Sequence, residues 1–192
     1  MTHKIKCAIA GLAMALASLQ AQAADADGCP AGSYSIVLAP DGATLSILFD
    51  KFTLDSPATT VKTCRIAAPL NLPADRSIGV YKVDYRGFAK LGARQETELD
   101  VRYLLGPQGP EHGRNFKRKV KGPHEGDYLF SETLGAGQMK RVGCGTAAIL
   151  NVNITLKLLG DTSAGAAMAS LDSTDAAPGA ALVYHLDLKQ CP

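Results

Sequence analysis

Hydrophobic and polar residues alternate with a period of two along most of this chain. Residues 34–38 alternate, Pro40-Asp41-Gly42 follows, and residues 44–49 repeat the alternation. Proline fixes φ, aspartate favours turns and glycine allows positive φ, so this tripeptide is a strong turn signal. The pattern predicts a β-hairpin over residues 34–49.

The same alternation continues to the C-terminus. We interpret 53–60 as a loop and 160–179 as a surface connection rich in Ala, Ser, Asp and Gly. Tyr81, Tyr85 and Tyr103 are expected on the apolar sides of their strands. We expect 77–91 to pair with 96–105, and the two C-terminal runs to pair with each other. Further strands are predicted at 64–72, 77–91, 96–105, 116–121, 127–133, 146–158, 168–171 and 182–188.

Beyond the first residues, no segment has a long apolar repeat at i, i+3, i+4 and i+7 between helix caps. About nine or ten short strands separated by turn signals are typical of an all-β protein. The chain of 192 residues is long enough to bury its own core. We therefore predict one antiparallel β-sandwich domain over residues 24–192, with jelly-roll wiring as one arrangement of such strands.

The first 23 residues have the features of a secretory signal peptide. Lys4 and Lys6 precede an apolar run from Cys7 to Leu19, and Ala21-Gln22-Ala23 provides small residues for cleavage. The run is about 13 residues, whereas a membrane-spanning helix needs about 20. We expect cleavage after Ala23, no transmembrane segment, and a mature protein that is secreted or periplasmic.

Four cysteines follow this leader, and an even number in an exported chain favours disulfides. Zinc ligands usually come in closely spaced pairs, whereas Cys29, Cys64, Cys144 and Cys191 are scattered singly. Four cysteines allow three pairings. We predict Cys29 with Cys64, because the first hairpin returns the chain toward Cys29, and Cys144 with Cys191, because pairing of the last two long strands would bring their ends together.

The charge balance changes when the leader is removed. The whole chain has 20 Lys and Arg and 18 Asp and Glu, and the leader takes two lysines and no acid, which leaves 18 of each. A neutral mature chain has no global basic field, so we expect no specific nucleic-acid partner. Any anionic partner must bind a local patch.

The strand predicted at 116–121 is the most distinctive polar feature. Lys117, Lys119 and Lys121 share one face at about 7 Å spacing, with Arg114 and Arg118 close by. These five residues could bind an anionic polysaccharide or another cell-surface component. The alternative is an edge strand that lysines protect from aggregation.

Evidence for catalysis is weak. The histidines after the leader, His112, His124 and His185, show no ligand or triad spacing, and we expect no metal and no cofactor. A glycosidase would need two carboxylates about 5 to 10 Å apart. Candidates for such a pair are Asp84, Glu96, Glu98, Asp100 and Asp127.

Several short motifs resemble the secreted family called domain of unknown function 4360. They are Gly28-Cys29-Pro30, Leu48-Phe49-Asp50, the run from Val83 to Phe88, Lys121-Gly122-Pro123 followed by Gly126-Asp127-Tyr128, Cys144-Gly145, and Tyr184-His185-Leu186 running into Cys191. The resemblance implies a secreted, cysteine-bridged, all-β domain of bacteria and fungi, and it implies no activity. The run from Arg114 to Lys119 is more basic than the family pattern.

Our leading hypothesis is a non-enzymatic secreted or periplasmic β-sandwich that interacts with an envelope, matrix or host-surface component. A polysaccharide-active hydrolase whose carboxylates converge only in three dimensions is the first alternative. A secreted inhibitor or effector that acts through a loop is the second.

Overall fold

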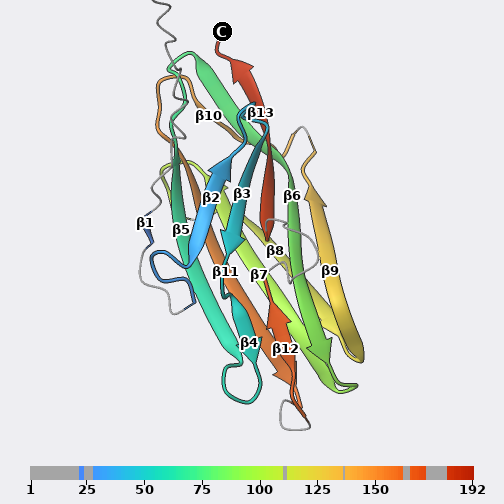
Figure 1. Ribbon diagram of the computed structural model, residues 1–192. Coiled ribbons are helices and arrows are strands. Elements are labelled where there is room, and N and C mark those ends of the chain that lie inside the picture. The colour runs from blue at the N-terminus through green and yellow to red at the C-terminus, as the bar shows by residue number, and fades with distance from the viewer. Residues whose placement is uncertain (1–21, 24–27, 110–111, 136, 162–164, 172–180) are drawn as a thin grey trace, which may run out of the picture.

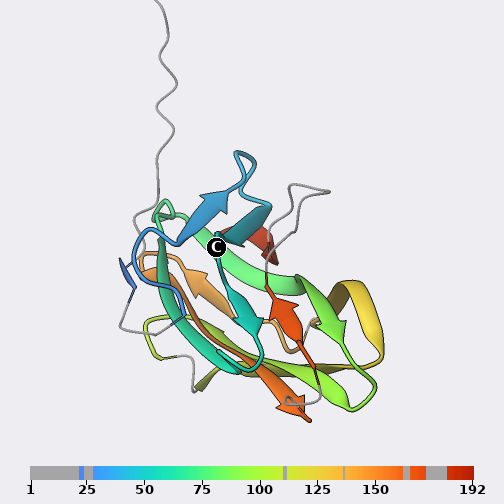
Figure 2. The ribbon, with the colours of Figure 1, turned by 60° about the horizontal axis from the view of Figure 1, so that its bottom comes forward.

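The computed structural model describes residues 22–23, 28–109, 112–135, 137–161, 165–171 and 181–192. These residues form two antiparallel β-sheets and contain no α-helix. Figure 1 shows β2, β3 and β13 of one sheet lying over β5, β11 and β7 of the other, and Figure 2 shows the two layers after rotation. The predicted β-sandwich is confirmed.

Sheet A has the strand order β1-β5-β11-β7-β8. Its strands are β1 (Gln22–Ala23), β5 (Val61–Leu70), β11 (Ala148–Gly160), β7 (Gln95–Leu105) and β8 (Arg114–Lys121). Sheet B has the order β2-β3-β13-β6-β12-β4, and β9 and β10 also pair with β6. Its strands are β2 (Tyr34–Leu38), β3 (Thr44–Phe49), β13 (Leu182–Gln190), β6 (Arg76–Leu91), β12 (Met168–Ser170), β4 (Thr53–Asp55), β9 (His124–Thr133) and β10 (Arg141–Gly143).

The long strands have jelly-roll wiring. One sheet contains β3-β13-β6-β9 in that spatial order, and the other contains β5-β11-β7-β8. From β2 onward, the chain crosses between the sheets after β4, β5, β6, β8, β10 and β11, and the long strands follow the double Greek-key pattern. Two predicted pairings are wrong for this reason: β6 lies in sheet B and β7 in sheet A, and β11 and β13 likewise belong to different sheets.

Most strands bury the predicted face. In β11, every second residue from Ala148 to Leu158 is buried, and β7 buries Leu99, Val101 and Tyr103. The expectation that 53–60 is a loop needs correction, because Thr53–Asp55 is a short strand that pairs with β12. The short strand predicted near 168–171 is confirmed as β12, whereas most of the surrounding connection lies outside the described residues.

Tyr81 is an exception to the alternation in β6. Lys82 faces His185 while Val80 faces Leu186, so the register shifts by one residue and Tyr81 is the extra residue of a β-bulge. Val80 and Val83 are both buried, but Tyr81 is 41% exposed. The prediction that Tyr81 belongs to the core is therefore wrong, while Tyr85 and Tyr103 are buried as predicted.

Aromatic side chains join the two sheets in the core. The Tyr85 ring of sheet B stacks on the Phe116 ring of sheet A with 4.0 Å between centroids, and Tyr103 meets Tyr184 edge to face at 5.5 Å. Burial raises the pKa of four tyrosines well above the usual value, because a phenolate would be poorly solvated there. We call Tyr85, Tyr103, Tyr128 and Tyr184 the buried tyrosines.

Both predicted disulfides are present. Cys29 bonds to Cys64 of β5, and Cys144 bonds to Cys191 with 5.8 Å between Cα atoms. The reason given for the second bridge was wrong, because β11 and β13 do not pair. Instead, Cys144 follows β10 and Cys191 follows β13, and both of these strands pair with the beginning of β6.

No helix among the described residues is long and apolar enough to cross a membrane. Most of the predicted leader lies outside the described residues, but Gln22 and Ala23 form β1 and pair with Ala67 and Ile66. Cleavage after Ala23 stays a prediction. If it occurs, it removes β1 and leaves β5 at the edge of sheet A.

Candidate functional site

The lysine strand, β8, lies at the edge of sheet A beside a row of carboxylates. Lys117 Nζ lies 3.3 Å from Glu98 Oε1 and 3.0 Å from Asp100 Oδ2. Lys119 Nζ lies 2.5 Å from Glu96 Oε1 and 3.7 Å from Glu98 Oε2. These hydrogen bonds raise the pKa of both lysines. The carboxylates of β7 thus neutralise much of the positive charge of the lysine strand.

The other three predicted binding residues are placed differently. Lys121 is exposed and has no ion pair within the described part of the chain. Arg118 lies over the Phe116 ring, with 4.7 Å from its guanidinium carbon to the ring centroid. Arg114 points away from the lysines and pairs with Glu132 of β9. The structure therefore separates the five residues. The three lysines face outward, Arg118 lies over an aromatic ring, and Arg114 belongs to a partly buried ion pair.

Arg114 belongs to a network that links both sheets. Its Nε and Nη2 donate to Glu132 Oε1 at 3.2 and 3.0 Å, and the hydroxyls of Tyr85 and Tyr103 donate to Glu132 Oε2 at 3.3 and 3.1 Å. Four donors therefore surround one carboxylate. The nearby negative charge of Glu132 also raises the pKa of Arg114, although burial opposes this effect.

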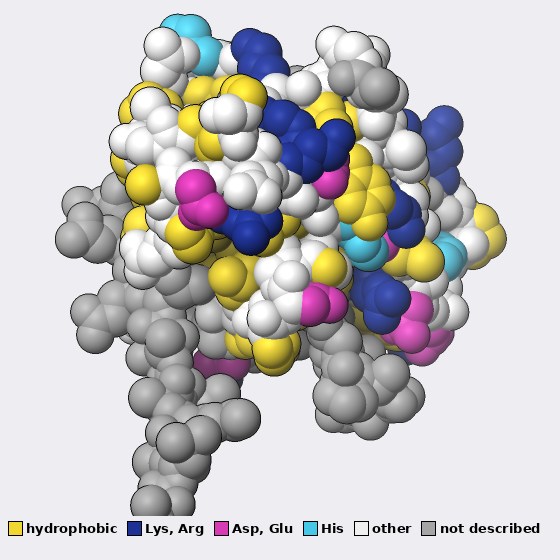
Figure 3. Space-filling model, turned by 90° about the horizontal axis from the view of Figure 1, so that it is seen from above, with side chains coloured by type: hydrophobic (Ala, Val, Ile, Leu, Met, Phe, Trp, Pro, Cys, Tyr) yellow, Lys and Arg dark blue, Asp and Glu magenta, His cyan; other side chains and the backbone are white. Residues whose placement is uncertain are grey.

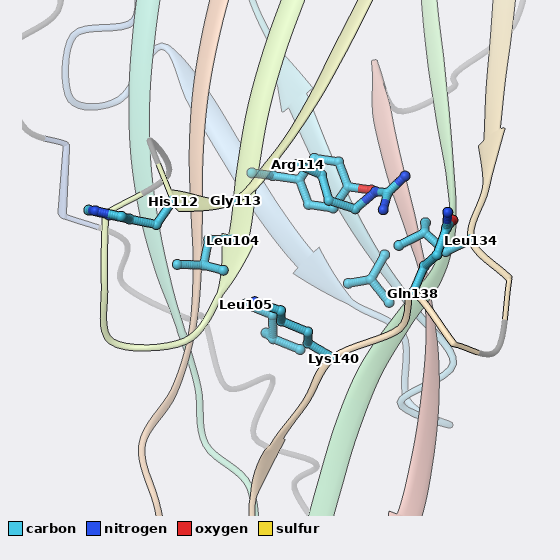
Figure 4. A pocket seen from close by; sticks show the side chains of 10 residues that line it. Leu104, Leu105, His112, Gly113, Arg114, Leu134, Gln138 and Lys140 are labelled. Atoms are coloured by element: carbon cyan, nitrogen blue, oxygen red, sulfur yellow. The ribbon is translucent and has the colours of Figure 1, made fainter.

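A pocket of about 130 Å³ lies beside Arg114. Val80, Leu105 and Leu134 supply apolar wall, and Arg114, Gln138 and Lys140 supply polar groups. Figure 4 shows the His112 side chain directed away from Arg114 and Gln138. An engineered apolar cavity of about 150 Å³ holds benzene. This pocket therefore fits only a small chemical group, and its arginine is already engaged by Glu132.

The outer face of sheet A offers a wider polar surface. The polar residues of β7 and β11 point to the same side, and the register places Arg102 opposite Asn153 and Asp100 opposite Thr155. Arg65 of β5 lies opposite Asn153 on its other side. We define the polar face as Arg65, Asp100, Arg102, Asn153, Thr155 and Lys157.

A hollow of about 270 Å³ opens within the polar face, lined by Asp100, Arg102, Asn153, Thr155 and Lys157. Asp100 is paired with Lys117, whereas Arg65, Arg102 and Lys157 have no ion pair among the residues that the structure describes. Arg102 and Lys157 are four residue levels apart, about 13 Å along the strands. The face thus presents separated cations with amide and hydroxyl groups between them.

This face was not predicted from the sequence, although the alternation of apolar and polar residues marks its members as solvent-facing. Arg102, Asn153 and Lys157 occupy the polar positions of their strands, which the period of two identifies. What was missing was the partner of each strand. Only the pairing of β11 with both β5 and β7 brings the cations Arg65, Arg102 and Lys157 onto one surface.

The catalytic alternatives find little support in the described geometry. Asp84 accepts hydrogen bonds from Ser131 and from His185 Nε2, the latter at 2.8 Å. In a serine-hydrolase triad the histidine lies between serine and aspartate, whereas here the serine donates to the aspartate. His124 Nε2 lies 3.1 Å from the Gly126 carbonyl oxygen. Within the described residues, no group of three or more His, Cys, Asp or Glu could hold a metal ion.

Charged side chains on the surface are mixed in sign. Figure 3, which looks down on the molecule from the top of Figure 1, shows dark blue and magenta side chains close to one another among yellow ones. No large field of one sign covers this end of the molecule in that view.

Comparison with known proteins identifies one family and one curated relative. The sequence model of a family described as domain of unknown function (DUF4360) matches residues 18–191. An uncharacterized secreted protein of Arthroderma benhamiae is 25% identical over 170 residues, which is 85% of this chain and 67% of that protein.

Solved structures give weaker similarities. A carbohydrate-binding module that recognises mannan, TmCBM27, is 6% identical, with 87% of this chain and 88% of that chain covered and a TM-score of 0.33. TmCBM61, solved with β-1,4-galactotriose, is 14% identical, with 88% of each chain covered and a TM-score of 0.24. Such low scores carry no functional argument.

Proposed function

The chain belongs to the DUF4360 family, and we propose that it is a secreted, non-enzymatic protein that binds an anionic polysaccharide of an envelope, matrix or host surface through its polar face. The observation that carries this proposal is the hollow between β7 and β11, where Arg102 and Lys157 have no ion pair with any residue that the structure describes. Two disulfides suit an oxidising compartment, and the Arthroderma benhamiae relative is a secreted protein.

The chemistry of the polar face suits a sugar polymer that carries carboxylate or sulfate groups. Arginine and lysine bind such anions, and arginine can do so with two parallel hydrogen bonds. Asn153 both donates and accepts hydrogen bonds, as does the Thr155 hydroxyl, and sugar hydroxyls do the same. Arg65, Asn153 and Arg102 lie in one row across three strands, about 10 Å wide. A chain crossing this row would meet alternating charged and uncharged groups.

The lysine strand is less suited to this role than the sequence alone predicted. A polyanion that approaches Lys117 or Lys119 competes with two carboxylates already in contact with each ammonium group, and it is repelled by their negative charge. Among the residues that the structure describes, no carboxylate pairs with Arg65, Arg102 or Lys157. We therefore place the main binding surface on the middle strands of sheet A, with Lys121 as an additional cation at its edge.

The test measures retention of the protein on immobilised polygalacturonate and, for comparison, on neutral dextran. We expect retention on polygalacturonate only. The variant Arg65→Ser/Arg102→Ser/Lys157→Ser should bind at least about tenfold more weakly. Binding by the wild type should weaken with salt, because screening shortens from about 10 Å at 0.1 M to 3 Å at 1 M.

The matched control is Lys51→Ser/Arg86→Ser/Lys140→Ser, which removes the same charge from exposed positions outside the polar face. It should retain nearly all of the binding. Equal losses in the two triple variants would show that only net charge matters and would refute the polar face. A third variant, Lys117→Ser/Lys119→Ser/Lys121→Ser, decides whether the lysine strand contributes.

A further inference from the structure

A second candidate site lies on the outer face of sheet B, where the β-bulge turns Tyr81 to the surface. Strict alternation would have buried this ring beside Val83 and Tyr85. The extra residue in β6 instead leaves it 41% exposed and places it 5.9 Å from the His185 ring, centroid to centroid. Bulges often redirect a side chain next to a functional site. The bulge therefore presents an aromatic ring on the outer face of sheet B.

Polar groups are held in fixed positions next to this ring. Asp84 Oδ2 accepts from Lys82 Nζ at 3.0 Å and from His185 Nε2 at 2.8 Å, and Asp84 Oδ1 accepts from Ser131. Asp84 is only 9% exposed, so the orientation of its partners is well defined. Burial raises the pKa of Asp84. The hydrogen bonds from Ser131, Lys82 and His185 and the charge of Lys82 lower it by more, so the pKa of Asp84 lies below its ordinary value. The carboxylate therefore stays ionised.

The cluster keeps hydrogen-bonding capacity for a ligand. The Lys82 ammonium has three donors and the His185 ring has a second nitrogen, and the structure shows one polar contact for each side chain, with Asp84. Ser131 donates its one hydroxyl hydrogen to Asp84 and can still accept, whereas the Tyr81 hydroxyl can both accept and donate. The negative Asp84 offsets the positive Lys82, so the cluster does not attract an anion by net charge. The cluster therefore combines one exposed aromatic ring with groups that can hydrogen-bond to an uncharged ligand.

We propose that Tyr81, Lys82, Ser131 and His185 form a binding subsite for one pyranose ring of an uncharged sugar. A pyranose has an apolar C–H face that can lie on an aromatic ring, and hydroxyl groups around its edge that both donate and accept. Tyrosine is suited to this contact because its ring is apolar and its hydroxyl is polar. This site lies on the opposite sheet from the polar face and would bind a ligand of different charge, so it extends beyond the function proposed above.

The experiment follows backbone amide signals of β6 and β13 by NMR during titration with four uncharged probes. These probes are cellohexaose, xylohexaose, laminarihexaose and maltohexaose, each added to about 10 mM because a single subsite binds weakly. We expect saturable shifts near residues 80–85 and 183–186 with at least one probe. No saturable shift with any of the four would overturn the proposal.

Variants separate stacking from structural effects. Tyr81→Ala should weaken the bound probe at least about tenfold, whereas Tyr81→Phe should stay within about threefold, because it keeps the ring. Lys90→Ala, an exposed position in the same strand, is the control and should bind as the wild type does. Unchanged binding in a folded Tyr81→Ala variant would overturn the proposal.

Salt distinguishes this subsite from the polar face. Binding of an uncharged sugar should change by less than about twofold between 0.1 and 1 M NaCl, whereas polygalacturonate binding at the polar face should weaken strongly over the same range. The triple variant of Arg65, Arg102 and Lys157 should leave the sugar titration unchanged. Loss of neutral-sugar binding in that variant would overturn the assignment to sheet B. Failure of polygalacturonate to bind would bear on the polar face alone.

Discussion

Replacement of Glu132 by glutamine tests whether the carboxylate that β9 presents to Arg114 of β8 holds the two sheets together. Glu132 accepts two N–H groups from Arg114 at one oxygen and two phenolic hydroxyls at the other. Glutamine keeps the size of the side chain and one acceptor oxygen, but it puts an NH₂ group where the second oxygen was. The variant therefore removes the charge and leaves the hydroxyls of Tyr85 and Tyr103 to reorient.

The expected cost follows from the character of these bonds. A hydrogen bond to a charged group contributes about 1.5–3 kcal/mol, and one between neutral groups about 1 kcal/mol. The Arg114 side chain is 37% exposed and Glu132 14% exposed, so solvent screens part of their attraction. We therefore expect Glu132→Gln to lower the free energy of unfolding by about 2 kcal/mol in total. In a domain of this size, that lowers Tm by about 4–8 °C.

Thermal unfolding of the mature protein, followed by circular dichroism at pH 7, measures this shift. The control is Lys90→Gln, which breaks an ion pair with Glu125 that is exposed on both sides and should leave Tm almost unchanged. The double variant Glu132→Met/Arg114→Met should be more stable than the sum of the single Met variants predicts, because neither charge is left unpaired. A Glu132→Gln protein that melts at the wild-type temperature would refute the idea that this network joins the sheets.

Three further predictions concern the frame. Replacing Cys144 and Cys191 by serine opens a loop of 47 residues and should cost up to about 4 kcal/mol, measured by urea unfolding; unchanged stability would contradict a structural role. Gly87→Ala should lower Tm strongly, because a Cβ there collides with the Tyr128 hydroxyl and a backbone oxygen, while Gly135→Ala has open space and should not; similar melting temperatures in the two variants would contradict the packing. The raised pKa values of the buried tyrosines stabilise the fold below the pH at which free tyrosine ionises, about 10, and this contribution is lost as pH rises above it. Ultraviolet titration should therefore show these phenols ionising together with unfolding, and ionisation in a still folded protein would contradict the prediction.

Much of the fold could be predicted from the sequence, because the local sequence alone sets which side of each strand is apolar. Side chains on a strand alternate between two sides, so a period of two in polarity shows which residues enter the core before any partner is known. This predicted the buried faces of β7 and β11, the hairpin of β2 and β3, and a sandwich with two sheets. The even cysteine count and the export leader likewise favoured two disulfides, and both pairings were right.

The partners of the strands were decided by tertiary structure. In a jelly roll, neighbours in sequence often lie in different sheets, so the pairing of β6 with β13 and β9, and of β7 with β11, depends on contacts far apart in the chain. Expectations based on sequence proximity therefore failed for β6 with β7. They also failed for the reason given for the Cys144–Cys191 bridge, although the bridge itself was correct.

The same physics explains which site residues could be foreseen. Residue type marked Lys117, Lys119 and Lys121 as cations, but only the alignment of β8 with β7 sets Lys117 and Lys119 beside carboxylates that neutralise them. Tyr81 departs from its face because one extra residue in β6 shifts the register, and a register shift has no signature in one strand read alone. Sequence determines which side of a strand is polar, because that is set residue by residue. The fold determines which charges meet, because that depends on strands brought together from distant parts of the chain.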